Sequence, residues 1–135
     1  MKELFAYLHP EGWAAPRGFS DGIVASGRLV FVAGQVGWNP ATGEFETDDF
    51  AAQTAQALNN VAAVLRTAGA DPSQLVRLTW YVTDRDAYLA ARTAIGAAYR
   101  RIIGTHYPTM SLVVVADLLE PRALVEIEAT AVVPA

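Results

Sequence analysis

Hydrophobic and polar positions repeat with two different periods along this chain, and these periods predict its strands and helices. Alternation of period two, or a short apolar run, predicts six strands, near Glu3–Leu8, Ile23–Ser26, Leu29–Ala33, Leu75–Thr83, Met110–Ala116 and Ala123–Val133. Apolar residues spaced by three and four predict two helices, one between Asp48 and Gly69 and one from about Asp86 to Ile103. The expected order is therefore β-β-β-α-β-α-β-β.

Local residue chemistry sets the boundaries of these elements. Asp48 and Asp49 favour a helix start, because a carboxylate there accepts hydrogen bonds from free backbone N–H groups. Gly69 and Gly104 are placed to end the two helices. The turn residues 26–28, Ser-Gly-Arg, predict that the strands on either side of them form a hairpin.

This arrangement predicts an α+β fold, in which a six-stranded mixed sheet has two helices packed on one face. One alternate set of the fourth strand is expected to be buried: Val76, Leu78, Trp80 and Val82. Two helices cannot cover the other face of such a sheet. Since the last two strands are strongly apolar, we expect the uncovered face to pack against other subunits.

The composition narrows the class of protein. A chain of 135 residues that is 53% hydrophobic and 18% charged suits one domain, spanning residues 1–135, with one core. The absence of cysteine excludes disulfides, thiol catalysis and thiolate metal sites. No apolar run reaches the length of a membrane span. The first residues, Met1–Leu4, do not begin the apolar stretch of a secretory signal, so we expect a cytoplasmic location.

The charge distribution argues against a nucleic-acid partner. The formal net charge is −4, and no stripe of basic residues is present to follow a phosphate backbone. Arg100–Arg101 is the only adjacent basic pair. Because cations are favoured near the C-terminus of a helix, we interpret this pair as a solvated helix end.

The last predicted strand carries the clearest candidate for acid–base chemistry. Glu126, Glu128 and Thr130 alternate with apolar residues and so share one face of the strand. A solvated acidic face is the simpler interpretation. The alternative is that one carboxylate lines a cleft and orients a water molecule.

The other polar motifs argue against a metal site, a Ser-His-Asp set and a dinucleotide-binding motif. His9 and His106 have no partners at ligand spacing, so the sequence predicts neither a metal site nor a Ser-His-Asp set, and a capping or surface role suits His106. The segment Gly34–Gly37 follows a strand but opens no helix, so it is not a dinucleotide-binding motif. Its glycines suit a tight turn, or a backbone N–H group that faces a ligand.

Several short segments resemble the Rid family, the YjgF-like reactive-intermediate deaminases, in the order and spacing of their residues. They are Gly27–Gln35, Asn39–Gly43, Gln53 with Leu58, Asn60 and Val61, Ala68–Ala70, Val82–Asp84, Tyr107–Pro108 with Ser111, and Val125–Ala129. Each segment alone is weak, but together they cover the chain from about residue 19 to residue 133.

The resemblance implies both an assembly and a reaction. The family fold is similar to that of chorismate mutase, and three subunits pack their sheets inward as a homotrimeric barrel with ligand sites in the clefts between subunits. Characterised members hydrolyse reactive imines or enamines and use no metal or cofactor. An arginine pairs with the substrate carboxylate, while a backbone group and a glutamate position the water. Gly34 and Glu126 stand at the matching positions here, which makes Glu126 the candidate catalytic residue.

The remaining candidate substrate-binding residues depart from the family pattern. Met110, two residues after Pro108, stands in place of the carboxylate-binding arginine, and a thioether cannot form that bidentate pair. Phe19 replaces a common tyrosine, and Leu112 replaces a small or thiol-bearing residue. Arg92 stands near a position often held by asparagine; it could supply a cation from another direction, although a solvated helix residue is the simpler interpretation.

Two functions from different classes follow. The first is hydrolysis of a small imine or enamine other than the usual 2-imino acid, which is favoured by Glu126. The alternative is a non-catalytic small-molecule-binding or interaction protein that retains the Rid trimer, which is favoured by Met110 and Phe19. A ribonuclease activity, sometimes attached to this family, finds little support in so acidic a chain.

Overall fold

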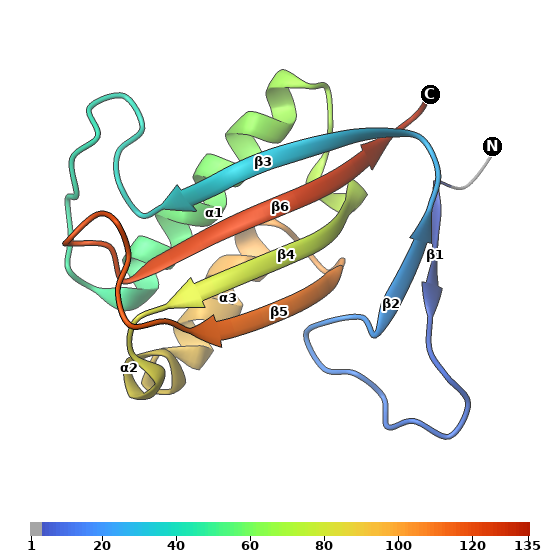
Figure 1. Cartoon of the computed structure of the whole chain (residues 1–135), viewed down its shortest axis with the longest axis horizontal. Helices are drawn as coiled ribbons and strands as arrows, with labels where there is room; N and C mark the ends of the chain where they lie inside the picture. The colour runs from blue at the N-terminus through green and yellow to red at the C-terminus, as the bar shows by residue number, and fades with distance from the viewer. Residues whose placement is uncertain (1–3) are drawn as a thin grey trace.

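A four-stranded mixed sheet forms the centre of the structure, a computed structural model that describes residues 4–135 (Figure 1). The strands lie in the order β3 (Arg28–Val36), β6 (Val125–Val133), β4 (Leu75–Val82) and β5 (Thr109–Val114). β6 runs antiparallel to both of its neighbours, whereas β4 and β5 are parallel. β1 (Phe5–Leu8) and β2 (Gly22–Ala25) form a separate antiparallel pair.

The predictions of one six-stranded sheet and of a hairpin around Gly27 are therefore wrong. β2 pairs with β1, and β3 pairs with β6 at the far end of the chain. Gly27 has a φ of 145°, and a Cβ at this position would lie 2.4 Å from the carbonyl oxygen of Val133. The chain turns here from one sheet into the other and does not fold back on itself. The predicted first strand included Glu3, which lies outside the described residues.

Helix α1 (Phe50–Thr67) begins and ends where the sequence predicts. The side chain of Asp49 caps it by accepting a hydrogen bond from the Ala52 backbone N–H at 2.9 Å. Gly69 follows the C-cap with a φ of 70°, a conformation that favours glycine. The helix lays its fully buried face on the sheet, through Ala57, Leu58, Val61 and Leu65.

The second predicted helix is broken into α2 (Arg85–Ala90) and α3 (Arg92–Ile102), which meet at Ala91. No glycine or proline stands at the break, so tertiary packing decides it. Tyr88 of α2 packs against Phe50 of α1 with ring centroids 6.3 Å apart, whereas Ile95 and Tyr99 of α3 are buried in the core. All three helices lie on the same side of the four-stranded sheet (Figure 1).

The predicted buried set of β4 is correct from Leu78 onward and wrong at its start. Leu75 is fully buried, whereas Val76 is only half-buried. The pairing of β4 with β6 is irregular between Leu75 and Arg77, which shifts the alternation by one residue. A short 3-10 helix, η1 (Pro72–Gln74), leads into the strand.

The sheet face that turns away from the helices, called the open face below, exposes large apolar side chains. Phe31 and Leu29 of β3 are 73% and 57% exposed, and Val113 of β5 is 43% exposed. None of the helices formed by residues 4–135 covers this face. No helix formed by residues 4–135 is long and apolar enough to span a membrane.

Candidate functional site

A pocket of about 480 Å³ opens between the helix-covered side of β4 and β5, the helices α2 and α3, and the loop before β2. Four of the predicted substrate-binding residues line it: Phe19, Arg92, Met110 and Leu112. Much of its remaining wall is aromatic, formed by Trp80, Tyr88, Tyr99 and Tyr107. Its size is typical of sites for small organic molecules.

The strand pairing explains why Met110 and Leu112 face this pocket. In the parallel pairing of β4 with β5, Met110 lies beside Leu78 and Leu112 beside Trp80. Leu78 and Trp80 are buried beneath the helices, so their neighbours on β5 point to the same side. Phe19 is held nearby because the backbone N–H of Ser20 donates a 3.0 Å hydrogen bond to the Pro108 carbonyl oxygen.

Ring stacking and hydrogen bonds hold the aromatic wall of the pocket in place. Tyr99 and Tyr107 stack with ring centroids 5.2 Å apart and planes 9° apart. The Tyr99 hydroxyl donates a hydrogen bond to the His106 carbonyl oxygen at 2.7 Å, and burial raises the pKa of this hydroxyl, so it stays protonated. The His106 ring lies 2.6 Å from the Leu75 carbonyl oxygen through Nε2, which gives this histidine a structural role between β4 and the loop before β5.

Gly34 and Glu126 meet on the open face of the sheet. The alternation of β6 buries Val125 and Ile127 in the core and leaves Glu126 on the opposite side. A Cβ added to Gly34 would lie 2.8 Å from the carboxyl carbon, Cδ, of Glu126. Only glycine therefore leaves room for the carboxylate in this position.

The carboxylates of Glu126 and Glu128 have different surroundings. The Tyr81 hydroxyl donates a 2.7 Å hydrogen bond to Glu128, and this bond raises the pKa of Tyr81. Within the described part of the chain, no side chain forms a hydrogen bond or an ion pair with Glu126. Of the two, Glu126 has the carboxylate that is free to hold a water molecule.

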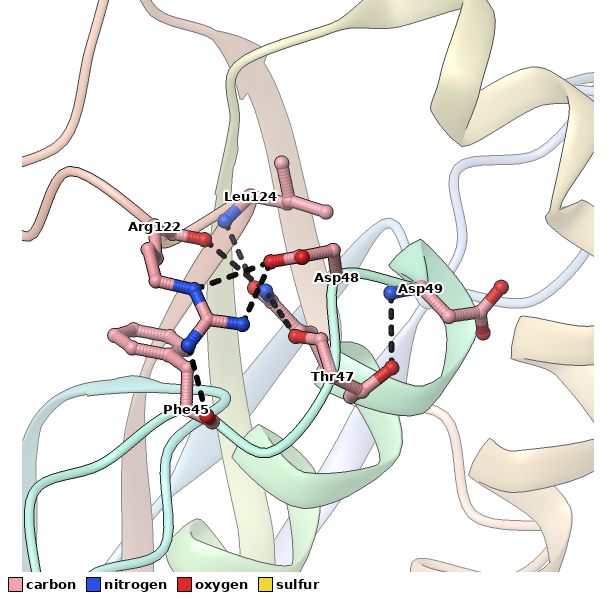
Figure 2. A network of polar contacts seen from close by, with 7 residues as sticks. Phe45, Thr47, Asp48, Asp49, Arg122 and Leu124 are labelled. Carbon is pink, nitrogen blue, oxygen red and sulfur yellow. Dashed lines mark hydrogen bonds and ion pairs between the residues drawn. The ribbon is translucent and has the colours of Figure 1, made fainter.

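A polar network fixes the start of β6 and hence the position of Glu126. The buried amide of Gln53 on α1 donates 3.0 Å hydrogen bonds to the carbonyl oxygens of Thr47 and Arg122, and it accepts one of 2.9 Å from the Leu124 backbone N–H. Figure 2 shows the Arg122 guanidinium bound to Asp48, at 2.8 Å through Nη2, and to the Phe45 carbonyl oxygen. The network joins the beginnings of α1 and β6.

The structure thus brings the six predicted site residues into two groups. Phe19, Arg92, Met110 and Leu112 line the pocket on the helix-covered side, whereas Gly34 and Glu126 lie together on the open face. The sheet separates the two groups within one chain. The local patterns could not show this division, because it depends on which face of the sheet the helices cover.

Comparison with known proteins assigns the family. The sequence model of the endoribonuclease L-PSP family matches residues 12–133. A RutC family protein of Haemophilus influenzae is 35% identical over 125 residues, which are 93% of this chain and 95% of that protein. The chain belongs to the Rid (YjgF-like) family. The resemblance deduced from the sequence is confirmed.

Two further relatives bear on activity and on fold, respectively. A 2-iminobutanoate/2-iminopropanoate deaminase of Escherichia coli is 36% identical over 110 residues, which are 78% of this chain and 80% of that enzyme. The crystal structure of a conserved Rid family protein from Yersinia pestis is 38% identical and has a TM-score of 0.85, over 97% of this chain and 100% of that chain. The Rid family therefore includes an imine deaminase, and this chain has the Rid fold.

Other residues that line the pocket of this Rid chain were not predicted from the sequence as site residues, among them two arginines and a tryptophan. Arg17 and Arg100 line the pocket, although Arg100 was interpreted as part of a solvated helix end. The Arg100 guanidinium lies near Gly96, where an added Cβ would meet its Nη1 at 3.4 Å. The spacing of four residues from Arg92 to Gly96 to Arg100 places all three on one helix face, and that signal could have found Arg100. Trp80, which was expected in the core, is buried there and also lines the pocket.

Proposed function

We propose that this Rid-family chain hydrolyses a small reactive imine or enamine without a cofactor, and that its substrate is not the usual 2-imino acid. The observation that supports hydrolysis is the free carboxylate of Glu126, which lies against Gly34 on the open face. A carboxylate held in this way can accept a proton from a water molecule as that water attacks the substrate.

The proposed reaction needs one water molecule and one proton relay. The water oxygen adds to the carbon of the C=N bond while Glu126 takes its proton. Glu126 passes this proton to the nitrogen, which gives a carbinolamine. The hydroxyl proton is then transferred to the nitrogen through the same carboxylate, the C–N bond breaks to release ammonia, and a carbonyl compound remains. An enamine enters the same route after its carbon is protonated to give the imine.

A complete site requires a second copy of the chain, because the sheet separates Glu126 from the pocket. We therefore propose that the open face of one subunit presents Glu126 and Gly34 to the pocket of its neighbour in a homotrimer. The exposed apolar side chains of Phe31, Leu29 and Val113 support this assembly, since a second subunit would remove them from water.

The assembly is tested by sedimentation equilibrium at micromolar protein concentration. We expect a mass three times the 14.5 kDa of one chain. Replacing Phe31 by glutamate should shift the equilibrium toward the monomer, because the new charge would be buried in the interface. Val64, which is 39% exposed on α1 and so lies on the helix-covered side of the sheet, supplies the control, and Val64→Glu should leave the mass unchanged. A folded monomer as the only species of the unmodified chain would contradict the trimer.

The proposed exclusion of 2-imino acids rests on Met110. A carboxylate that enters the cleft loses its water, and a thioether cannot compensate for that loss. With an amino-acid oxidase generating 2-iminopropionate from alanine, we expect the Met110→Arg variant to accelerate loss of the imine at least about tenfold more than the unmodified chain, since a hydrogen bond to a charged group is worth roughly 1.5–3 kcal/mol.

The same assay, with the rate of the oxidase alone as its blank, can contradict the proposed exclusion of 2-imino acids. Strong acceleration by the unmodified chain, with no gain from Met110→Arg, would show that another group binds the carboxylate. If neither protein accelerates the loss of any imine, including neutral ones, the alternative of a non-catalytic binding protein is favoured.

A further inference from the structure

Three arginines surround the pocket, although the chain as a whole is acidic. Arg17, Arg92 and Arg100 line it, and none of the described residues that line it is acidic. Within residues 4–135, the structure shows no ion pair or hydrogen bond for any of the three guanidinium groups. An excess of positive charge without internal partners, in a chain of net charge −4, indicates that the pocket attracts an anion.

Trp80, which lines the same pocket, carries a buried hydrogen-bond donor. Trp80 is only 5% exposed, and its indole Nε1–H has no hydrogen-bond partner within the described residues. Such a group destabilises the folded protein unless an acceptor reaches it. Since Trp80 lines the pocket, a ligand in the pocket is the natural source of that acceptor.

The rest of the wall is suited to a flat apolar body. Tyr99 and Tyr107 offer a stacked aromatic pair, and Met110 and Leu112 add aliphatic surface. The hydroxyl of Tyr99 is already engaged with the His106 carbonyl oxygen, so it does not compete with Trp80 as a donor. The pocket thus combines a cationic rim, an apolar floor and, in Trp80, a buried neutral donor without a partner.

We propose that the pocket binds an aryl-substituted organic acid, whose acidic group meets the arginine rim and whose separate acceptor atom meets the Trp80 N–H. This inference rests on the proposed function for the identity of the atom that accepts the Trp80 hydrogen bond. That atom would be the imine nitrogen before hydrolysis and the carbonyl oxygen after it. The inference also explains the presence of Met110. Because the acidic group would bind away from the reacting carbon, an apolar residue can occupy the position where the family has arginine.

Three small probes separate the parts of this proposal without requiring turnover. 4-Acetylbenzoate carries a carboxylate, a flat ring and a ketone oxygen. 4-Acetylbenzamide has the same ring and ketone but no charge, and 4-ethylbenzoate has the charge but no ketone. Each is titrated into ¹⁵N-labelled protein while the indole N–H signals of Trp13, Trp38 and Trp80 are followed, after assignment with single Trp→Phe variants.

We expect 4-acetylbenzoate to bind at least about tenfold more tightly than 4-acetylbenzamide, since hydrogen bonds to charged groups are the stronger ones. Only the Trp80 signal should move downfield with the ketone, and it should not do so with 4-ethylbenzoate. Arg92→Gln and Arg100→Gln should each weaken 4-acetylbenzoate binding by about tenfold and leave 4-acetylbenzamide unaffected. Arg66→Gln, which removes an exposed arginine of α1 that does not line the pocket, should change neither affinity.

Equal affinity for the acid and the amide would overturn the anion site. A Trp80 signal that does not respond to the ketone, or that responds equally to 4-ethylbenzoate, would overturn the role of its N–H group. These outcomes are separate from those of the hydrolysis assays. If the chain binds 4-acetylbenzoate as expected but hydrolyses no imine, the proposed function is wrong and the ligand site is supported. If the chain hydrolyses neutral imines but does not bind 4-acetylbenzoate, only the inference about the ligand site is wrong.

Discussion

Replacing Glu126 by glutamine should lower the rate of imine hydrolysis by about 10²–10⁴-fold while the trimer stays intact, because that is the range that a positioned acid–base group contributes. Glutamine keeps the size of the side chain and its place against Gly34, but it cannot accept a proton from water. Since Glu126 lies on the open face and not in the core, the substitution should leave the free energy of unfolding nearly unchanged. Turnover is measured on a substrate that the unmodified chain has been shown to hydrolyse.

Glu128 provides a matched control for this prediction. It lies two residues further along the same face of β6, but its carboxylate accepts the hydrogen bond from Tyr81. Glu128→Gln should therefore change turnover little. Gly34→Ala tests the position of the carboxylate, since the new Cβ would lie 2.8 Å from the Glu126 Cδ and would displace it. Unchanged turnover in Glu126→Gln, or an equal loss in Glu128→Gln, would return Glu126 to the solvated acidic face.

Replacing Gln53 by leucine should lower the free energy of unfolding by about 3 kcal/mol, the combined cost of leaving partly buried backbone groups without partners. Leucine fills a similar volume but leaves the carbonyl oxygens of Thr47 and Arg122 and the N–H of Leu124 unsatisfied. For a domain of this size the melting temperature should fall by roughly 10 °C. The same network holds the start of β6, so a loss of turnover should accompany the loss of stability.

Gln56 on the same helix supplies the control, because its side chain is only half-buried and donates one hydrogen bond, to Asn60 at 2.8 Å. Gln56→Leu should cost about 1 kcal/mol or less. Both variants are compared by guanidinium denaturation at one fixed protein concentration, since the stability of an oligomer depends on the protomer concentration. Equal midpoints for the two variants would show that the Gln53 network does not stabilise the fold.

Features that depend on neighbouring residues could be predicted from the sequence. The start of α1 after its N-cap Asp49 and its end before Gly69 follow from capping chemistry, which acts within a few residues. The burial of Val125, Ile127 and Ala129 follows from the strict two-residue period of a strand. The order of the family segments along the chain was specific enough to indicate the Rid fold, which the comparisons confirm.

Strand pairing and helix continuity could not be predicted in the same way. Gly27 resembles a hairpin turn, yet β3 pairs with β6 about a hundred residues later, because that pairing places both strands in the sheet beneath α1. The break between α2 and α3 at Ala91 has no local sequence signal. The irregular pairing of β4 with β6 near Leu75 buries Leu75 and not Val76, although Val76 was expected to be buried. Each of these depends on contacts between residues far apart in sequence.

The candidate site shows the same division. The sequence by itself determined which residues stand at the family positions, including Glu126, Gly34 and Met110. Only the tertiary structure decided that Glu126 and Met110 lie on opposite faces of the sheet, and that Arg100 lines a pocket with Arg92. A periodic pattern indicates which residues of one element share a face. Packing across the whole chain decides which face is covered and which residues of other elements contact it.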